Sequence, residues 1–150
     1  MRTLALLRHG RAAGQGPDAR LTPQGIELFQ RLAAALKAEG WRPVAMLSSP
    51  FTRALDSART LATGLGIAPS PIVLNELTPD NEPLAALQAI DAAAPGSALI
   101  LVVSHLPLVA RIAGELLGEE IAFTPATLVE IADQGDGRPR LVRQLRPEDL

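Results

Sequence analysis

The sequence predicts an α/β fold, a three-layer α/β/α sandwich with a mostly parallel sheet, in one domain over residues 1–150. Short apolar runs alternate with longer segments whose apolar residues recur at helical spacing. The run at residues 98–104 is apolar without alternation, which is typical of a central parallel strand covered by helices on both faces. A chain of 150 residues with 47% hydrophobic residues can bury one core, so one domain is expected.

The first half of the chain contains three predicted strands and two predicted helices. We expect strands at residues 4–9, 44–48 and 72–74, and helices at residues 23–39 and 51–65. Thr22 suits the N-cap of the first helix because its hydroxyl can accept an unpaired N–H, and Pro23 suits the first helical position. Apolar residues from Ile26 to Leu36 give this helix one buried face, and Gly40 ends it.

The second half continues the alternation and then changes to a hairpin. A polar loop at residues 75–80 is followed by a helix at 84–94, a strand at 98–104, a helix at 106–117, and strands at 127–132 and 141–145. Asp133, Gly135 and Gly137 make residues 133–137 a strong turn signal between the last two strands.

The composition excludes several functions. The net charge of −2 and the 3% of aromatic residues argue against a nucleic-acid-binding protein, because bulk positive charge and stacking rings are both missing. The sequence contains no cysteine, which rules out disulfides, thiolate catalysis and cysteine-bound metals. No apolar stretch approaches the roughly 18 residues of a membrane span, and the N-terminal apolar run is too short for a signal peptide. We therefore expect a cytoplasmic protein without a membrane partner.

Basic side chains stand where predicted strands end. Arg8 and His9 end the first strand, and His105, the only other histidine, follows the central strand. Arg53 lies in the first turn of the second helix, and Arg20 lies in the loop before the first helix. Because ligands of open α/β sheets bind beyond the carboxyl ends of the strands, we expect these groups to converge into an anion site. Guanidinium groups match phosphate oxygens, and helix N-termini add N–H donors.

A histidine in such a site has a chemical role open to it. Neutral imidazole is a nucleophile near neutral pH and can carry a covalent phosphoryl group, whose charge fixed cations stabilise. Phosphoryl transfer to His9, with Arg8, Arg53 and His105 holding the oxygens, is therefore coherent chemistry that needs no metal and no cofactor. A metal site built from His9 and His105 is the alternative, but it lacks a fixed third ligand.

Three sequence blocks resemble the signatures of the histidine phosphatase superfamily, which has the phosphoglycerate mutase-like fold. They are Leu7-Arg8-His9-Gly10, Ser48-Ser49-Pro50-Phe51-Thr52-Arg53-Ala54 and Ser104-His105. Their order and approximate separation agree with the superfamily. The chain is most similar to the short bacterial phosphohistidine phosphatases of this family, with which it also shares Glu76-Leu77-Thr78-Pro79 and the segment from Ser104 to Val109.

The resemblance implies a role for each matched residue. His9 would be the phosphorylated nucleophile, and Arg8, Arg53 and His105 would bind the phosphoryl group. Arg20 would match a further arginine of the substrate-binding pocket. Many relatives place an acidic proton donor after the third strand, and Glu76 is the candidate there, with Asp80 behind it. A leaving imidazole can already be protonated, so it needs this donor less than an alkoxide does.

The short chain favours an open site. Larger members of the superfamily carry a helical insertion that walls the pocket, and residues 76–97 leave room for one loop and one helix. An open site suits a phosphohistidine on a partner protein, for example a phosphorelay or phosphotransferase-system protein, which is the function we expect. A phosphatase for small phosphate esters is the alternative within the superfamily. A phosphate-binding or phosphoprotein-binding module without catalysis is the alternative from another class, although it would not require the histidine nucleophile.

Overall fold

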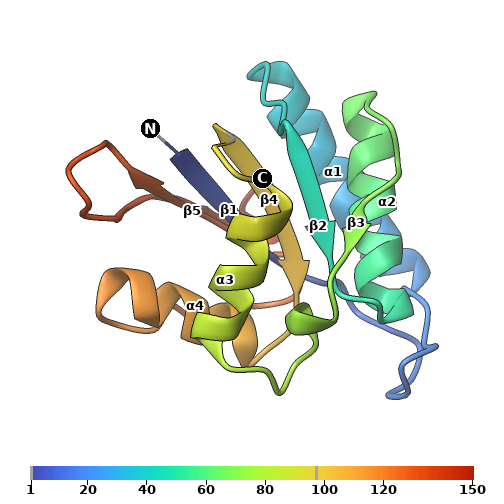
Figure 1. Ribbon diagram of the computed structural model, residues 1–150. Helices are drawn as coiled ribbons and strands as arrows, with labels where there is room; N and C mark the ends of the chain where they lie inside the picture. Colours follow the sequence, from blue (N-terminus) through green and yellow to red (C-terminus); the bar gives the residue numbers. More distant parts are fainter. Residues whose placement is uncertain (1, 97) are drawn as a thin grey trace.

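The protein, described by a computed structural model for residues 2–96 and 98–150, is built on one six-stranded sheet (Figure 1). The strands are β1 (Arg2–Arg8), β2 (Ala45–Ser48), β3 (Ile72–Val73), β4 (Leu99–Ser104), β5 (Leu128–Asp133) and β6 (Arg140–Leu145). Their order is β3-β2-β4-β1-β5-β6. The first four are parallel, whereas β5 and β6 form an antiparallel hairpin beside β1. The predicted mostly parallel sheet and the predicted hairpin are both confirmed.

Helices cover both faces of this sheet, which confirms the three layers. The helices are α1 (Pro23–Ala38), α2 (Thr52–Leu65), α3 (Pro83–Ala93) and α4 (Leu108–Leu117). In Figure 1, α1 and α2 lie on one side of the strands, and α3 and α4 on the other. Side chains alternate along β1 between two cores: Leu4 and Leu6 pack with the α3 and α4 side, whereas Ala5 and Leu7 pack with the α1 and α2 side.

Local signals in the sequence explain most helix boundaries. The Thr22 hydroxyl accepts the Gly25 N–H at 3.0 Å, as expected of an N-cap. Ile26, expected in the buried face of α1, is instead 37% exposed because it lies at the edge of that face. Helix α4 begins at Leu108 and not at residue 106, since a residue that precedes proline disfavours helical backbone.

Two short 3₁₀ helices lie in segments that the sequence left without regular structure. Asn75–Leu77 occupies the predicted polar loop after β3, and Pro147–Asp149 follows β6. Between β3 and α3 the chain therefore contains only residues 74–82, with no inserted helical domain (Figure 1). None of the helices in the described part of the chain is long and apolar enough to cross a membrane.

The parallel strands bring distant loops to one edge of the sheet. Arg8 at the end of β1 pairs in register with Ser104 at the end of β4, and Ser48 of β2 pairs with Val103. Immediately after β1 the chain passes close to α1. A Cβ on Gly10 would lie 2.7 Å from the ring of Phe29, so only glycine fits this turn. The segments that follow β1, β2 and β4 thus meet at one place.

Candidate active site

His9 and His105 lie side by side at the carboxyl ends of β1 and β4. Their ring centroids are 4.8 Å apart and the rings are tilted by 59°. The register of the two strands causes this, because the His9 N–H donates to the Ser104 carbonyl at 3.0 Å. Both side chains are buried: His9 is 9% exposed and His105 is 2% exposed. The structure therefore brings together two histidines that are far apart in the sequence.

His9 is oriented and kept neutral by its surroundings. Its Nδ1 lies 2.7 Å from the Gly10 carbonyl, which can only accept, so Nδ1 carries the hydrogen and Nε2 keeps its lone pair. Burial lowers the pKa of His9 to about 4, against the opposing effect of the Gly10 hydrogen bond, and the charges of Arg8 and Arg53 lower it further. At neutral pH, His9 is thus an uncharged imidazole with an unprotonated Nε2, the form required of a nucleophile.

His105 packs directly beside His9. Burial lowers its pKa to about 3, with smaller contributions from His9, Arg53 and Arg8. Its Nε2 lies 2.7 Å from the Ser49 hydroxyl, which also accepts the Phe51 N–H at 3.2 Å. The ring of Phe51 packs against His105 with an edge-on geometry at 4.8 Å. These contacts hold His105 in one orientation.

Arg8 and Arg53 are tied to backbone carbonyls on either side of the histidines. Nη1 of Arg8 donates to the Phe123 carbonyl at 2.9 Å, and Nη2 of Arg53 donates to the Gly16 carbonyl at 2.7 Å. In both arginines Nε is buried without a hydrogen-bond partner. Unsatisfied buried donors are costly, and they are expected where a ligand supplies an acceptor. The two guanidinium groups are therefore fixed cations with unused capacity to bind an anion.

A cavity of about 410 Å³ opens beside these groups. Its walls come from the end of β1, the loop that follows it, the N-cap of α1, the first turn of α2 and the loop before β5; they are Arg8, His9, Gly10, Arg11, Ala12, Gly14, Thr22, Arg53 and Pro125. No carboxylate is among these residues. Sequence reasoning missed Arg11, although its place directly after Gly10, in the loop beyond a strand, was a usable signal.

Backbone N–H groups contribute less to this site than the sequence suggested. The first N–H of α2, on Thr52, donates to the Pro17 carbonyl at 2.9 Å. The Gly10 N–H donates to the Ser57 hydroxyl at 3.1 Å, and that hydroxyl donates to the Arg53 carbonyl at 2.6 Å. The expectation of free helix-terminal donors is wrong for Thr52, because the loop after β1 folds over the start of α2. Ser57 instead links the His9–Gly10 turn to the helix that carries Arg53.

His105 packs against His9 but is not among the residues that line this cavity, and two further residues named by the sequence lie apart from it. Arg20 has a side chain that is 80% exposed and directs its Nε toward Asp56 of α2, at 3.7 Å. Its substrate-binding role stays a prediction. Glu76 is exposed on the 3₁₀ helix after β3 and does not line the cavity. The neighbouring Leu77 carbonyl accepts the Ser104 hydroxyl at 2.6 Å, which anchors this loop next to His105. The proton-donor role of Glu76 remains a prediction.

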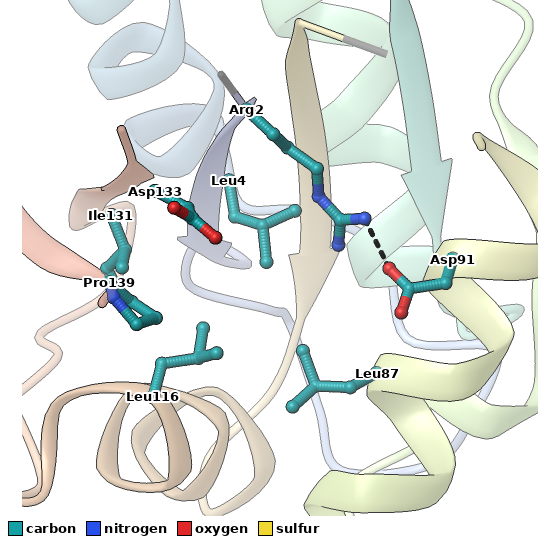
Figure 2. A pocket seen from close by; sticks show the side chains of 8 residues that line it. All are labelled: Arg2, Leu4, Leu87, Asp91, Leu116, Ile131, Asp133 and Pro139. Atoms are coloured by element: carbon teal, nitrogen blue, oxygen red, sulfur yellow. Dashed lines mark ion pairs between the residues drawn. The ribbon is translucent and has the colours of Figure 1, made fainter. Parts of the chain in front are cut away.

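A second cavity, of about 270 Å³, lies at the opposite end of β1. Figure 2 shows that Leu87 from α3 and Leu116 from α4 point into it, and that Arg2 pairs with Asp91 at its rim. It contains no histidine, and its one cation, Arg2, is paired with Asp91, so it does not offer the groups of an anion site. No group of three metal-ligating side chains occurs in residues 2–96 and 98–150. The donors at the His9 site are therefore imidazole and guanidinium nitrogens.

Fold and site together define an α/β protein in which a neutral histidine and two arginines with unpartnered donors meet at the carboxyl ends of parallel strands. The family model of the histidine phosphatase superfamily (branch 1) matches residues 4–78, which include Arg8, His9 and Arg53. The phosphohistidine phosphatase SixA of Escherichia coli K12 is 32% identical over 153 residues, covering 97% of this chain and 94% of that protein. The chain belongs to the histidine phosphatase superfamily.

Solved structures agree with this assignment. A structure of the protein histidine phosphatase SixA complexed with tungstate has a TM-score of 0.89 and 28% identity, with 98% of both chains covered. A phosphoserine phosphatase variant from Entamoeba histolytica, in complex with phosphoserine, has a TM-score of 0.79 at 17% identity, with 100% of both chains covered. At that identity the second likeness concerns the fold alone.

Proposed function

We propose that the protein is a phosphohistidine phosphatase that acts on a phosphohistidine-bearing protein through a covalent intermediate on His9. The observation that carries this proposal is the neutral His9, with Nε2 free, beside two guanidinium groups that have unused donors. The similarity to SixA supports the substrate class. Tungstate, which is bound in the SixA structure, is a tetrahedral oxyanion like phosphate.

The proposed reaction has two steps. In the first, the substrate phosphohistidine enters with a proton already on its other ring nitrogen; Nε2 of His9 attacks phosphorus, the bond from phosphorus to the substrate ring breaks, and the ring leaves as neutral imidazole. In the second, water attacks phosphorus on His9, and orthophosphate leaves while Nε2 regains its lone pair. The Gly10 carbonyl stabilises the positive charge that spreads to Nδ1 of phosphorylated His9. Arg8, Arg53 and His105 hold the phosphoryl oxygens.

The open form of the site supports a protein substrate. Arg11 and Gly14 at the mouth of the cavity are exposed, and no helical insertion follows β3. A phosphohistidine that protrudes from a protein surface can therefore enter the cavity. A protonated leaving imidazole also reduces the demand on a proton donor, in agreement with the exposed position of Glu76.

Trapping of the intermediate tests this proposal. Wild-type protein is mixed with a phosphohistidine carrier domain labelled with ³²P, and the reaction is stopped in alkali, where phosphohistidine survives. We expect label on the wild-type chain and none on His9→Ala, because only His9 offers a free imidazole nitrogen to the cavity. Arg59→Ala, a change on the exposed side of α2, serves as the matched control and should retain the label. Equal labelling of His9→Ala would refute the nucleophile assignment.

The wild-type protein and the carrier domain also serve to test whether the substrate is a phosphoprotein or a small phosphate ester. The initial rate of phosphate release from the carrier domain is compared with that from p-nitrophenyl phosphate at matched concentration. We expect a strong preference for the carrier domain. Faster release from the ester would instead identify a small-molecule phosphatase that uses the same nucleophile.

A further inference from the structure

A third arginine stands at the mouth of the catalytic cavity. Arg11 lines the same cavity as Arg8 and Arg53. Its side chain is exposed, whereas the other two are partly buried and bound to carbonyls. Arg11 takes part in none of the ion pairs found within residues 2–96 and 98–150. Its guanidinium group is thus available to a ligand.

The backbone of Arg11 is held in place although its side chain is free. The Arg11 carbonyl accepts the Thr22 N–H at 2.9 Å, and Ala12 forms an isolated β-bridge with Leu21. Gly25 in the first turn of α1 packs so closely that a Cβ there would lie 3.0 Å from the Arg11 carbonyl oxygen. The side chain therefore starts from a fixed point next to His9. Such a placement suits a residue that recognises a feature close to the phosphoryl group.

The positive charge that lines the cavity exceeds the negative charge of one phosphoryl group. A phosphoryl group carries a charge of about −2 near neutral pH, which the guanidinium groups of Arg8 and Arg53 balance. His9 and His105 add no charge, since burial keeps both rings neutral. Arg11 adds one more cation, and no carboxylate lines the cavity to neutralise it. A substrate whose only charged group is the phosphoryl group would leave Arg11 without an anionic partner.

We propose that Arg11 binds a second anionic group, a carboxylate, that lies beside the phosphoryl group of the substrate. The inference rests on the proposed function of the same cavity and specifies its substrates. On a phosphoprotein the carboxylate belongs to an Asp or Glu near the phosphohistidine. On a small phosphate ester it belongs to the same molecule. Both sources present the same chemistry to Arg11.

Two matched substrate pairs distinguish the sources. The first pair is a phosphohistidine peptide with Asp beside the phosphorylated residue and the same peptide with Asn there. The second is phosphoglycolate and ethyl phosphate, which differ by a carboxylate against a methyl group. We expect wild-type protein to favour the acidic member by roughly three- to tenfold in kcat/KM, the effect of a solvent-accessible but well-placed ion pair. High salt should reduce this preference because it screens exposed charges.

Substitutions at Arg11 should change the preference between the two members of each pair. Arg11→Ala should lower kcat/KM more for the acidic member than for the neutral one and bring the ratio close to one. Arg11→Lys should keep part of the preference, and Arg11→Glu should reverse it. Arg59→Ala, which removes an exposed arginine outside the cavity, should keep the wild-type ratio.

Each remaining outcome has a defined meaning. Equal losses on both members of a pair with Arg11→Ala, or no preference in the wild type, would overturn the role of Arg11. Hydrolysis of both peptides at equal rates, with label trapped on His9, would retain the proposed function and refute this inference. Arg11-dependent preference for phosphoglycolate, with no peptide hydrolysed, would retain the role of Arg11 and refute the proposed protein substrate. Calorimetric titration of His9→Ala with each ligand provides the same comparison where turnover is absent.

Discussion

The two imidazoles of the site owe their chemistry to burial. A free histidine is half protonated near pH 6.5, whereas the pKa of His9 is lowered to about 4 and that of His105 to about 3. In each case burial is the largest cause, and the nearby guanidinium groups act in the same direction. His9 therefore remains a neutral nucleophile under conditions in which an exposed histidine would be charged.

These lowered pKa values predict a pH-dependent stability. Between about pH 6.5 and pH 4 the unfolded chain binds protons on both histidines and the folded chain does not. The free energy of unfolding should therefore fall as the pH falls through this window, by roughly 1.4 kcal/mol per pH unit for each histidine. Urea denaturation at several pH values measures the slope, and NMR titration of the ring protons reports the individual pKa values.

A variant tests whether the two buried histidines cause the pH dependence of the unfolding free energy. His105→Asn should make the pH dependence between pH 6.5 and 4 shallower, because one proton-binding group is removed from the unfolded chain. Titration of both rings near pH 6.5 in the folded protein would contradict the prediction. Added tungstate should raise the pKa of His9, since a nearby anion favours the charged ring.

At the scale of elements, the close packing of α1 against α2 positions Arg53. Gly64 in α2 faces Ala33 in α1, and a Cβ on Gly64 would lie 2.5 Å from the Cβ of Ala33. The two helices can approach this closely only because one of the two residues lacks a side chain. The first turn of α2 then places Arg53 beside the cavity, and Ser57 joins that helix to Gly10.

Gly64→Ala should destabilise the protein although alanine is the better helix former. The overlap with Ala33 forces the helices apart, at a cost of about 1–3 kcal/mol, which exceeds the gain in helix propensity of up to about 1 kcal/mol. Urea denaturation measures the net loss, and Thr63→Ala, an exposed change in the same helix, is the control. The double variant Ala33→Gly/Gly64→Ala should recover much of the stability. A more stable Gly64→Ala would show that the packing is looser than described.

At the scale of the whole molecule, parallel strand order converts separated segments into one anion site. The arginines come from β1 and α2, and the histidines follow β1 and β4. Two of the cations are held with unsatisfied buried donors. An oxyanion that supplies the missing acceptors binds only the folded chain, and such binding stabilises the fold.

Phosphate or tungstate should therefore raise the melting temperature. At a ligand concentration about 100 times the Kd, linkage predicts about 2.7 kcal/mol of added stability. Differential scanning fluorimetry follows the shift, which should be much smaller in Arg53→Ala and unchanged in Arg59→Ala. A full shift in Arg53→Ala would mean that the anion binds elsewhere.

The sequence by itself determined the layers, the sheet type and the meeting of four basic residues at one edge of the sheet. Apolar runs and helical spacing are local patterns, and they correctly predicted the α/β/α sandwich and the hairpin of β5 and β6. The polar residues that follow buried strands must lie at the edge of a parallel sheet, so Arg8, His9 and His105 could be placed together without a structure. Arg53 was identifiable from its position in the first turn of the second helix.

Only the tertiary structure decided how the remaining polar groups are used. Arg11 and Arg20 lie in the same loop, yet Arg11 lines the cavity and Arg20 turns toward Asp56, a partner from another element. The tautomer and pKa of His9 likewise depend on the Gly10 carbonyl, on burial and on arginines brought from elsewhere. Local sequence patterns report backbone periodicity, whereas the partners and the burial of a side chain are set by residues distant in the chain, which only folding brings into contact.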